Sequence, residues 1–258
     1  MSSTSITWWG HSTVWLADSG TTLLTDPLLT SRLAHLRRMA GPIPSLPGEP
    51  DAVLLSHLHA DHFHVASLRA LPGTPRLVVP RGAGRFVAKA MGAAAVARCV
   101  ELAPGDDVTI GRLKVTAVPA THDGDRGPWS REKAMAIGFV IEGAARTWYA
   151  GDTGLFDQML DLPPLDLALI PVGGWGPTLG AHGHLDAADA AEALRRVKAA
   201  WAVPVHYGTF WPLGLGRVRS HMFHEPGRRF ATLAAKAAPD SRVRVLGHGE
   251  TLTIGRPA

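Results

Sequence analysis

Short apolar runs with alternating or β-branched residues, separated by turn residues, recur along most of the chain and predict β-strands. The first three cover residues 6–9, 13–17 and 21–25, and the Asp18-Ser19-Gly20 turn before the third strand predicts a hairpin. Further strands are expected at residues 52–55, 76–80, 96–102, 108–110, 113–119, 136–142, 146–149, 165–172 and 201–204.

Apolar residues at helical spacing are less frequent. Residues 63–70 are expected to form a helix with Asp61 as its N-cap, and residues 82–91 a second one. The segment from Asp186 to Lys198 has a 3.6-residue apolar period and a capping aspartate at its start, which predicts a third helix. A last helix is expected at residues 227–238.

Two irregular regions complete the secondary-structure prediction. Residues 30–50 carry several prolines and glycines near their end, which predicts a long loop. Residues 243–254 are expected to form a hairpin around Gly247-His248-Gly249.

The strands fall into two long groups, residues 6–118 and 136–254, each with helices behind it. No linker separates the groups and no short-period repeat is present. We therefore expect a single domain over residues 1–258, an α/β fold in which two sheets pack face to face and helices cover their outer sides in four layers.

Composition and charge exclude some classes of protein. The net charge is +4 and no block of five or six like charges occurs, so no dedicated nucleic-acid surface is expected, while an anionic small substrate is compatible. The single cysteine, Cys99, lies in an apolar stretch and is expected to be buried, and one cysteine cannot form an internal disulfide. No signal peptide and no run of 18 apolar residues is evident, so we expect a cytoplasmic protein without stable membrane insertion.

A dense cluster of titratable residues follows the apolar run 52–55. Three histidines and an aspartate (His57, His59, Asp61 and His62) fall within six residues, and such groups are costly to bury unless a metal ion pairs with them. His57 and His59 are two apart, so they project to the same side of an extended strand end. The segment can therefore offer one ligand pair to one metal and a second pair to a neighbouring metal, which predicts further ligands at other strand ends.

Three downstream residues meet that expectation. His122, Asp152 and His206 each stand where a predicted strand gives way to a loop, the position at which α/β proteins gather their sites. Each would be an ordinary loop or turn residue by itself. Together with the cluster at 57–62 they predict one shared metal site.

The series His57-x-His59-x-Asp61-His62, His122, Asp152 and His206 resembles the metallo-β-lactamase-fold hydrolase superfamily over nearly the whole chain. Four short stretches, at residues 10–13, 24–27, 147–154 and 205–210, look like the branch that holds N-acyl-phosphatidylethanolamine phospholipase D and L-ascorbate-6-phosphate lactonase. The resemblance implies an αβ/βα sandwich of two mixed sheets, with two metals at one edge of the strands.

The resemblance also implies a role for each ligand. His57, His59 and His122 would hold one divalent metal, Asp61, His62 and His206 the other, and Asp152 would bridge the two together with a hydroxide. The redox di-iron members carry a carboxylate where this chain has His59, so the histidine points to a zinc hydrolase. Ligation by nitrogen and oxygen alone leaves manganese and iron open.

Other residues are candidates for support and substrate contact. His11 and Asp26 are expected to hydrogen-bond the ligands, with simple turn capping as the alternative. Asp61 could orient the hydroxide and His184 could donate a proton to the leaving group. Arg126 is expected to reach for an anionic group, and three loop tryptophans to form an apolar wall, with packing under the loops as the alternative: Trp129, Trp175 and Trp211.

The predicted function is a dinuclear metal-dependent hydrolase acting on a phosphodiester or a related phosphorylated small molecule. The alternative is a lactonase that opens a cyclic ester with the same hydroxide. A true β-lactamase is less favoured, because such enzymes are usually exported and no signal peptide is visible. A tRNase-like activity would need an added RNA-gripping arm, and none is seen in this sequence. A metal-free binding protein is disfavoured, because all seven ligand positions are filled. The phospholipase relatives carry a longer N-terminal part and a membrane-facing surface. In this sequence Trp8 already belongs to the first predicted strand, which argues against a bilayer substrate. Homo-oligomers are common in the superfamily, and the sequence leaves the oligomeric state open.

Overall fold

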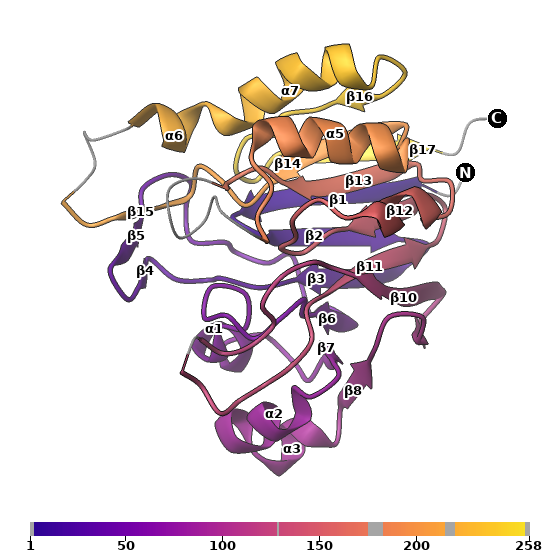
Figure 1. Ribbon diagram of the computed structural model, residues 1–258. Coiled ribbons are helices and arrows are strands. Elements are labelled where there is room, and N and C mark those ends of the chain that lie inside the picture. Colours follow the sequence, from indigo (N-terminus) through magenta and orange to yellow (C-terminus); the bar gives the residue numbers. More distant parts are fainter. Residues whose placement is uncertain (1–2, 128, 175–182, 215–219, 256–258) are drawn as a thin grey trace.

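Two mixed sheets of seven strands each form the centre of the computed structural model, which describes residues 3–127, 129–174, 183–214 and 220–255 (Figure 1). The first sheet has the order β17-β1-β2-β3-β6-β7-β8. Its strands are β1 (Ser3–Gly10), β2 (Thr13–Asp18), β3 (Thr21–Thr25), β6 (Ala52–Leu54), β7 (Arg76–Pro80), β8 (Cys99–Leu102) and β17 (Thr251–Gly255). The pairs from β17 to β3 are antiparallel and those from β3 to β8 are parallel.

The second sheet repeats this division, in the order β16-β14-β13-β12-β11-β10-β9. Its strands are β9 (Asp107–Ile110), β10 (Leu113–Pro119), β11 (Ile137–Glu142), β12 (Arg146–Tyr149), β13 (Leu167–Pro171), β14 (Trp201–Val205) and β16 (Arg242–Val243). Strands β9 to β12 form an antiparallel meander, and β12, β13, β14 and β16 are parallel.

Helices cover the outer side of each sheet (Figure 1). On the first sheet lie α1 (Val65–Arg69), α2 (Gly84–Met91) and α3 (Ala93–Val96), and on the second lie α5 (Ala187–Val197) and α7 (Pro226–Ala237). The short helix α6 (Ser220–His224) precedes α7, and a 3₁₀ turn, η1 (Asp157–Asp161), packs beside α5. The predicted architecture of two sheets face to face with helices outside is confirmed.

Side-chain alternation explains why these layers form. In β13, Leu167 and Leu169 enter the apolar cluster between the sheets, while Ala168 and Ile170 pack against α5 on the other face. All five residues of this central strand are buried, as expected for a strand covered on both sides. Burying an aliphatic side chain of this size contributes roughly 1.5–3 kcal/mol.

Two predictions about the irregular regions are wrong. Residues 30–50 contain a hairpin of β4 (Arg32–Leu33) and β5 (Leu36–Arg38), and β5 pairs with β15 (Phe210–Pro212) in a small third sheet. Residues 243–254 do not form a hairpin, because β16 joins the second sheet and β17 crosses to pair with β1 in the first.

The division of strands between the sheets also differs from the sequence prediction. Strands β9 and β10 lie in the second sheet although they belong to the first predicted group, and β17 lies in the first sheet. Pairing of β17 with β1 at the two ends of the chain is a long-range contact that local pattern does not report.

Two smaller predictions need correction. Asp61 does not cap a helix, because α1 begins at Val65 and the side chain of His64 accepts the capping hydrogen bond from the Ser67 amide. Cys99 is half-buried rather than buried, since β8 is the edge strand of its sheet.

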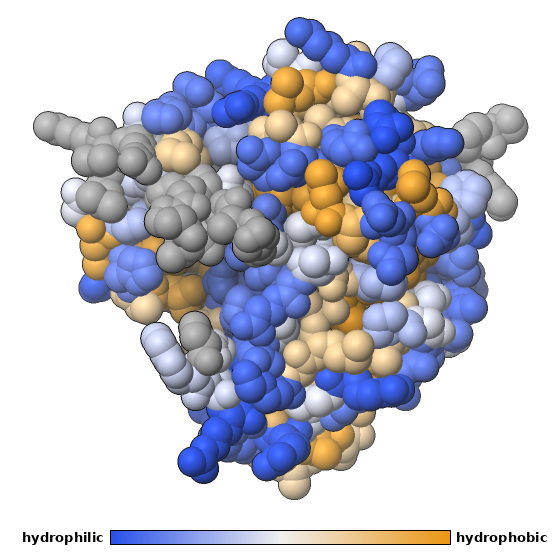
Figure 2. Space-filling model, viewed as in Figure 1, coloured by the Kyte–Doolittle hydropathy of each residue, from blue (hydrophilic) through white to orange (hydrophobic). Residues whose placement is uncertain are grey.

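None of the described helices is long and apolar enough to cross a membrane. On the face shown in Figure 2, hydrophobic residues appear in small groups separated by hydrophilic ones.

Candidate metal centre

The predicted ligands come together at one edge of the two sheets. His57 to His62 follow β6, His122 follows β10, Asp152 follows β12 and His206 follows β14. Strands β12 and β14 run parallel with β13 between them, so their C-terminal ends lie on the same side of the sheet. His57, His62, Asp152 and His206 are all buried.

Three imidazoles form the first group. Nδ1 of His59 lies 3.0 Å from Nε2 of His57 and 3.1 Å from Nε2 of His122. Tetrahedral ligands bound at about 2.0–2.1 Å to one zinc ion lie roughly 3.3 Å apart, so these nitrogens need to move apart only slightly to surround one zinc ion. The three nitrogens therefore suit a single cation.

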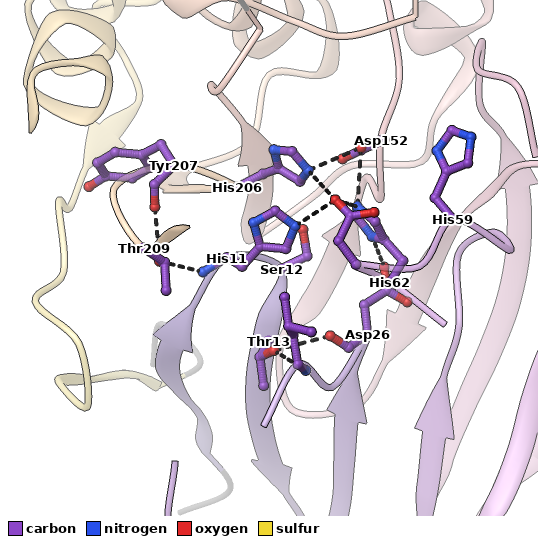
Figure 3. A network of polar contacts seen from close by, with 12 residues as sticks. His11, Ser12, Thr13, Asp26, His59, His62, Asp152, His206, Tyr207 and Thr209 are labelled. Carbon is purple, nitrogen blue, oxygen red and sulfur yellow. Dashed lines mark hydrogen bonds and ion pairs between the residues drawn. The ribbon is translucent and has the colours of Figure 1, made fainter. Parts of the chain in front are cut away.

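The second group joins Asp61, His62 and His206. Oδ2 of Asp61 lies 3.7 Å from Nε2 of His62 and 3.8 Å from Nε2 of His206. Oδ2 of Asp152 lies 3.2 Å and 3.1 Å from the same two nitrogens. Asp152 also offers a ligand atom within 4.8 Å of one from His122, a member of the first group, so its carboxylate adjoins both groups. Figure 3 shows this carboxylate beside the ring of His206.

Several buried polar atoms of the site have no hydrogen bond within the described part of the chain. They are Nε2 of His62, Nε2 of His206 and Oδ1 of Asp152. The two nitrogens make ion-pair contacts, the nearest with Oδ2 of Asp152 at 3.2 and 3.1 Å, and an unsatisfied buried polar group such as Oδ1 of Asp152 costs roughly 1–3 kcal/mol. Divalent cations between these atoms would remove that cost, so the residues present fit a two-metal site.

Burial and neighbouring charge set the ionisation of the first group. Burial lowers the pKa of His57 well below its usual value, and the neighbouring histidines His62 and His122 lower it further. Burial is also the main cause that lowers the pKa of His122 to about 4. These imidazoles are therefore neutral at physiological pH, which is the form that binds a metal.

The second group is held by opposite charges. Burial lowers the pKa of His206, but Asp152 and Asp61 more than offset this and raise it to about 9. Burial raises the pKa of Asp152, yet the neighbouring His206 and His62 bring it well below its usual value. Asp152 is therefore ionised, while His206 carries a proton that a metal ion would displace.

The residues expected to support the ligands are in contact with them. Nε2 of His11 lies 3.0 Å from Oδ2 of Asp61, and Nδ1 of His62 lies 2.6 Å from Oδ2 of Asp26. Nδ1 of His122 lies 2.8 Å from the Gly183 carbonyl oxygen, so this ring donates its proton there and presents Nε2 to the first group.

The backbone is strained at the same place. His11, Asp26 and His206 have φ values of 52°, 33° and 59°, which side-chain-bearing residues rarely adopt. The His206 amide donates to the His11 carbonyl, and the hydroxyl of Thr209 accepts from the His11 amide (Figure 3). Such strain persists where surrounding contacts over-determine it, as they do at functional sites.

The structure places His184 at the site. Its Nε2 lies 3.4 Å from Oδ2 of Asp152, and its side chain is 13% exposed. His122, Asp152 and His184 also offer ligand atoms that lie within 4.8 Å of one another.

Arg126, which the sequence analysis expects to reach for an anionic group, is held by contacts within the protein. Its Nη1 donates to the carbonyl oxygens of Leu58 and Phe63, and its guanidinium stacks 4.8 Å above the ring of Phe86. Arg126 therefore fastens the backbone that carries the first four ligands.

The predicted tryptophan wall is also not observed. The side chain of Trp129 is 95% exposed, whereas Trp211 is buried on β15 with its ring 5.6 Å from that of Phe223. Trp211 therefore follows the alternative of packing under its loop. Trp175 lies outside the described residues.

Two buried residues of the site were missed by the sequence analysis. Ser56 precedes the histidine cluster and Tyr149 precedes Asp152 by three positions, and both touch Asp26. The only signal was proximity in sequence to a ligand. His248, from the predicted turn Gly247-His248-Gly249, stacks on Trp8 and contacts the Thr209 hydroxyl, so it packs behind the site.

Comparisons with known proteins identify relatives of the chain. A family model described as a β-lactamase superfamily domain matches residues 21–207. An uncharacterized protein of Mycobacterium tuberculosis is 32% identical over 91% of this chain, and the chain spans 64% of that relative's length. A UPF0173 metal-dependent hydrolase of Methanoculleus marisnigri is 32% identical over 97% of this chain and 96% of its own.

Solved structures agree on the fold. A metallo hydrolase from the hyperthermophilic archaeon Ignicoccus hospitalis superposes with a TM-score of 0.73, covering 98% of both chains at 22% sequence identity. At this level of identity the likeness concerns the fold alone.

Proposed function

This chain belongs to the β-lactamase superfamily and to its UPF0173 metal-dependent hydrolases, and from that premise we propose that it is a dinuclear metal-dependent hydrolase of small molecules. The observation that carries the proposal is the position of Asp152. Its carboxylate adjoins two separate groups of ligand atoms, and its Oδ1 is buried without a hydrogen bond in the described residues.

The residues divide the work between them. His57, His59 and His122 would hold one ion, Asp61, His62 and His206 the other, and Asp152 would lie between them. Two bound divalent ions lower the pKa of water and neutralise charge on the group under attack. The neutral imidazoles of His57 and His122 and the ionised carboxylate of Asp152 already have the donor forms that such ions require, and His206 would reach that form by losing its proton.

Proton transfer to the leaving group is assigned to His184. Its ring is partly exposed beside Asp152, so it can face both the ligands and an entering substrate. An imidazole at such a place can donate a proton to an alkoxide as the bond to it breaks. Asp61, whose Oδ2 also faces His11, can accept a hydrogen bond from the attacking water.

The substrate that we favour is a phosphodiester or a related phosphorylated small molecule, and the alternative is a lactone. The four short stretches that look like the phospholipase D and ascorbate-6-phosphate lactonase branch support both substrates. The net charge of +4 is compatible with an anionic substrate. Zinc is the metal that His59 favours, with manganese and iron as alternatives.

Metal analysis followed by three rate measurements tests the proposal. Protein purified in added zinc is expected to hold two ions per chain and to hydrolyse bis-p-nitrophenyl phosphate faster than a simple lactone or a chromogenic cephalosporin. Faster turnover of the lactone would favour the alternative. Protein that binds no zinc, manganese or iron would refute both.

A further inference from the structure

One buried carboxylate, that of Asp26, is linked by hydrogen bonds to ligands of both metal groups. Asp26 is fully buried, and four donors point at it. The Ser56 amide lies 2.8 Å from Oδ1, and the other three lie near Oδ2: the Ser56 hydroxyl at 2.5 Å, Nδ1 of His62 at 2.6 Å and the Tyr149 hydroxyl at 2.5 Å.

The direction of each hydrogen bond follows from chemistry. A carboxylate only accepts, so the contact with Asp26 keeps a proton on Nδ1 of His62. Nε2 of His62 is then the nitrogen left to bind a metal, and it points at Asp152 and Asp61. Asp26 thus orients a ligand of the second group directly.

Ser56 extends the same control to the first group. Its hydroxyl has one hydrogen, and the short contact with Asp26 uses it. The oxygen is then an acceptor for Nδ1 of His57, 2.9 Å away. Nε2 of His57 is left to face Nδ1 of His59, where the first ion would bind.

Tyr149 holds this carboxylate from the opposite sheet. Asp26 follows β3 and Ser56 follows β6 in the first sheet, whereas Tyr149 ends β12 in the second. Burial and the neighbouring Asp26 raise the pKa of Tyr149 well above its usual value, so the phenol keeps the proton that it donates. Asp152 follows on the same chain segment, three residues later.

We infer that Asp26, through Ser56 and with Tyr149 as its anchor, is a shared positioning residue that makes the two metal groups bind their ions as a coupled pair. Binding at His62 fixes Asp26, which fixes Ser56 and the ring of His57 before the other ion arrives. The ion that binds at the first group then loses less free energy to ordering its ligands, and this gives positive cooperativity between the two ions. This inference rests on the proposed metal binding.

Metal titration of three variants tests the coupling. Metal-free protein is titrated with Zn²⁺ by calorimetry and with Co²⁺ by its visible absorption, neither of which depends on turnover. Ser56→Ala breaks the path to His57 and leaves the Asp26–His62 contact. Asp26→Asn removes the shared acceptor, and asparagine tolerates the positive φ of this position. Ser12→Ala is the matched control, because the Ser12 hydroxyl is buried nearby without a hydrogen bond in the described residues.

Wild type and Ser12→Ala are expected to take up two ions in one overlapping step. Ser56→Ala should lower the affinity of one ion by about 10–100-fold and separate the two steps, and Asp26→Asn should lower both affinities. If Ser56→Ala took up its two ions in one overlapping step, as wild type does, this would overturn the inference and leave the proposed function intact. Wild type that takes up no metal would overturn the proposed function itself.

A second arm covers the case in which Asp26→Asn does not fold. Tyr149→Phe keeps the carboxylate and the ring but removes the anchoring hydroxyl. Tyr207→Phe is its control, because the Tyr207 ring stacks on Trp8. Weaker uptake of both ions in Tyr149→Phe alone is expected, and equal titrations of the two variants would overturn the anchoring role.

Discussion

Asp152 Oδ2 lies 3.1 Å from His206 Nε2, at the ends of two parallel strands that have β13 between them. The contact is an ion pair in the metal-free chain, because His206 is protonated at neutral pH and Asp152 is ionised. The site is thus held together by the same charges that a metal ion would replace.

Replacing Asp152 by asparagine is expected to remove one of the two bound ions and to lower kcat/KM by at least about 100-fold, because the carboxylate that lies beside His62, His206 and His122 is lost. Elemental analysis and the phosphodiester assay measure the two effects. Asp157→Asn is the control, since that side chain is 98% exposed. Full metal content in Asp152→Asn would contradict the bridging position.

The two metal groups should differ in their dependence on pH. His122, with its pKa lowered to about 4, is neutral throughout the physiological range, whereas His206, with its pKa raised to about 9, must lose a proton when metal binds. Affinity at the second group should therefore rise with pH up to about 9, with proton release near pH 7. Calorimetry in buffers of different ionisation enthalpy measures that release, and identical heats in all buffers would contradict the prediction.

The stability of the metal-free protein should fall on acidification. Burial lowers the pKa of both His11 and His122 to about 4 from 6.5, so between pH 6.5 and 4 the unfolded chain binds more protons than the folded one. Each shift corresponds to a loss on the order of 3 kcal/mol in the free energy of unfolding across that interval. Urea unfolding of the chelator-treated protein at pH 6.5, 5.5 and 4.5 checks this, and a flat profile would contradict it.

The parts of the site that depend on local sequence could be predicted, and those that depend on packing could not. The spacing of His57, His59, Asp61 and His62 lies in one segment, and His122 and His206 each follow a strand that its apolar run identifies. A long side chain such as Arg126 can turn to either side of its loop, and only tertiary contacts decide between carbonyl groups and substrate.

Which sheet a strand joins also depends on tertiary contacts, so the sequence did not predict it. Strand β17 pairs with β1, which lies at the other end of the chain, so the residues around Gly247 were expected to form a local hairpin. Ser56 and Tyr149 gave no periodic signal, because their role is to meet one carboxylate from two sheets.

Arg126→Ala is expected to lower stability and leave substrate affinity unchanged. The guanidinium donates to two carbonyl groups of the ligand-bearing segment, and loss of hydrogen bonds from a charged group costs roughly 1.5–3 kcal/mol each. Thermal unfolding of the zinc-loaded variant measures the loss, and Arg131→Ala, an exposed change in the same loop, is the control. A raised KM at unchanged stability would instead restore the substrate-binding role.

His184→Asn separates proton donation from metal binding. If His184 protonates the leaving group, the variant should keep both ions and lose about 10²–10⁴-fold in rate on a phosphodiester with an alkoxide leaving group. It should lose little on bis-p-nitrophenyl phosphate, because p-nitrophenolate departs without a proton. The exposed His35 provides the control variant His35→Asn. Equal losses on both substrates, or a lost metal ion, would show that His184 acts as a ligand beside Asp152 and His122 rather than as the acid.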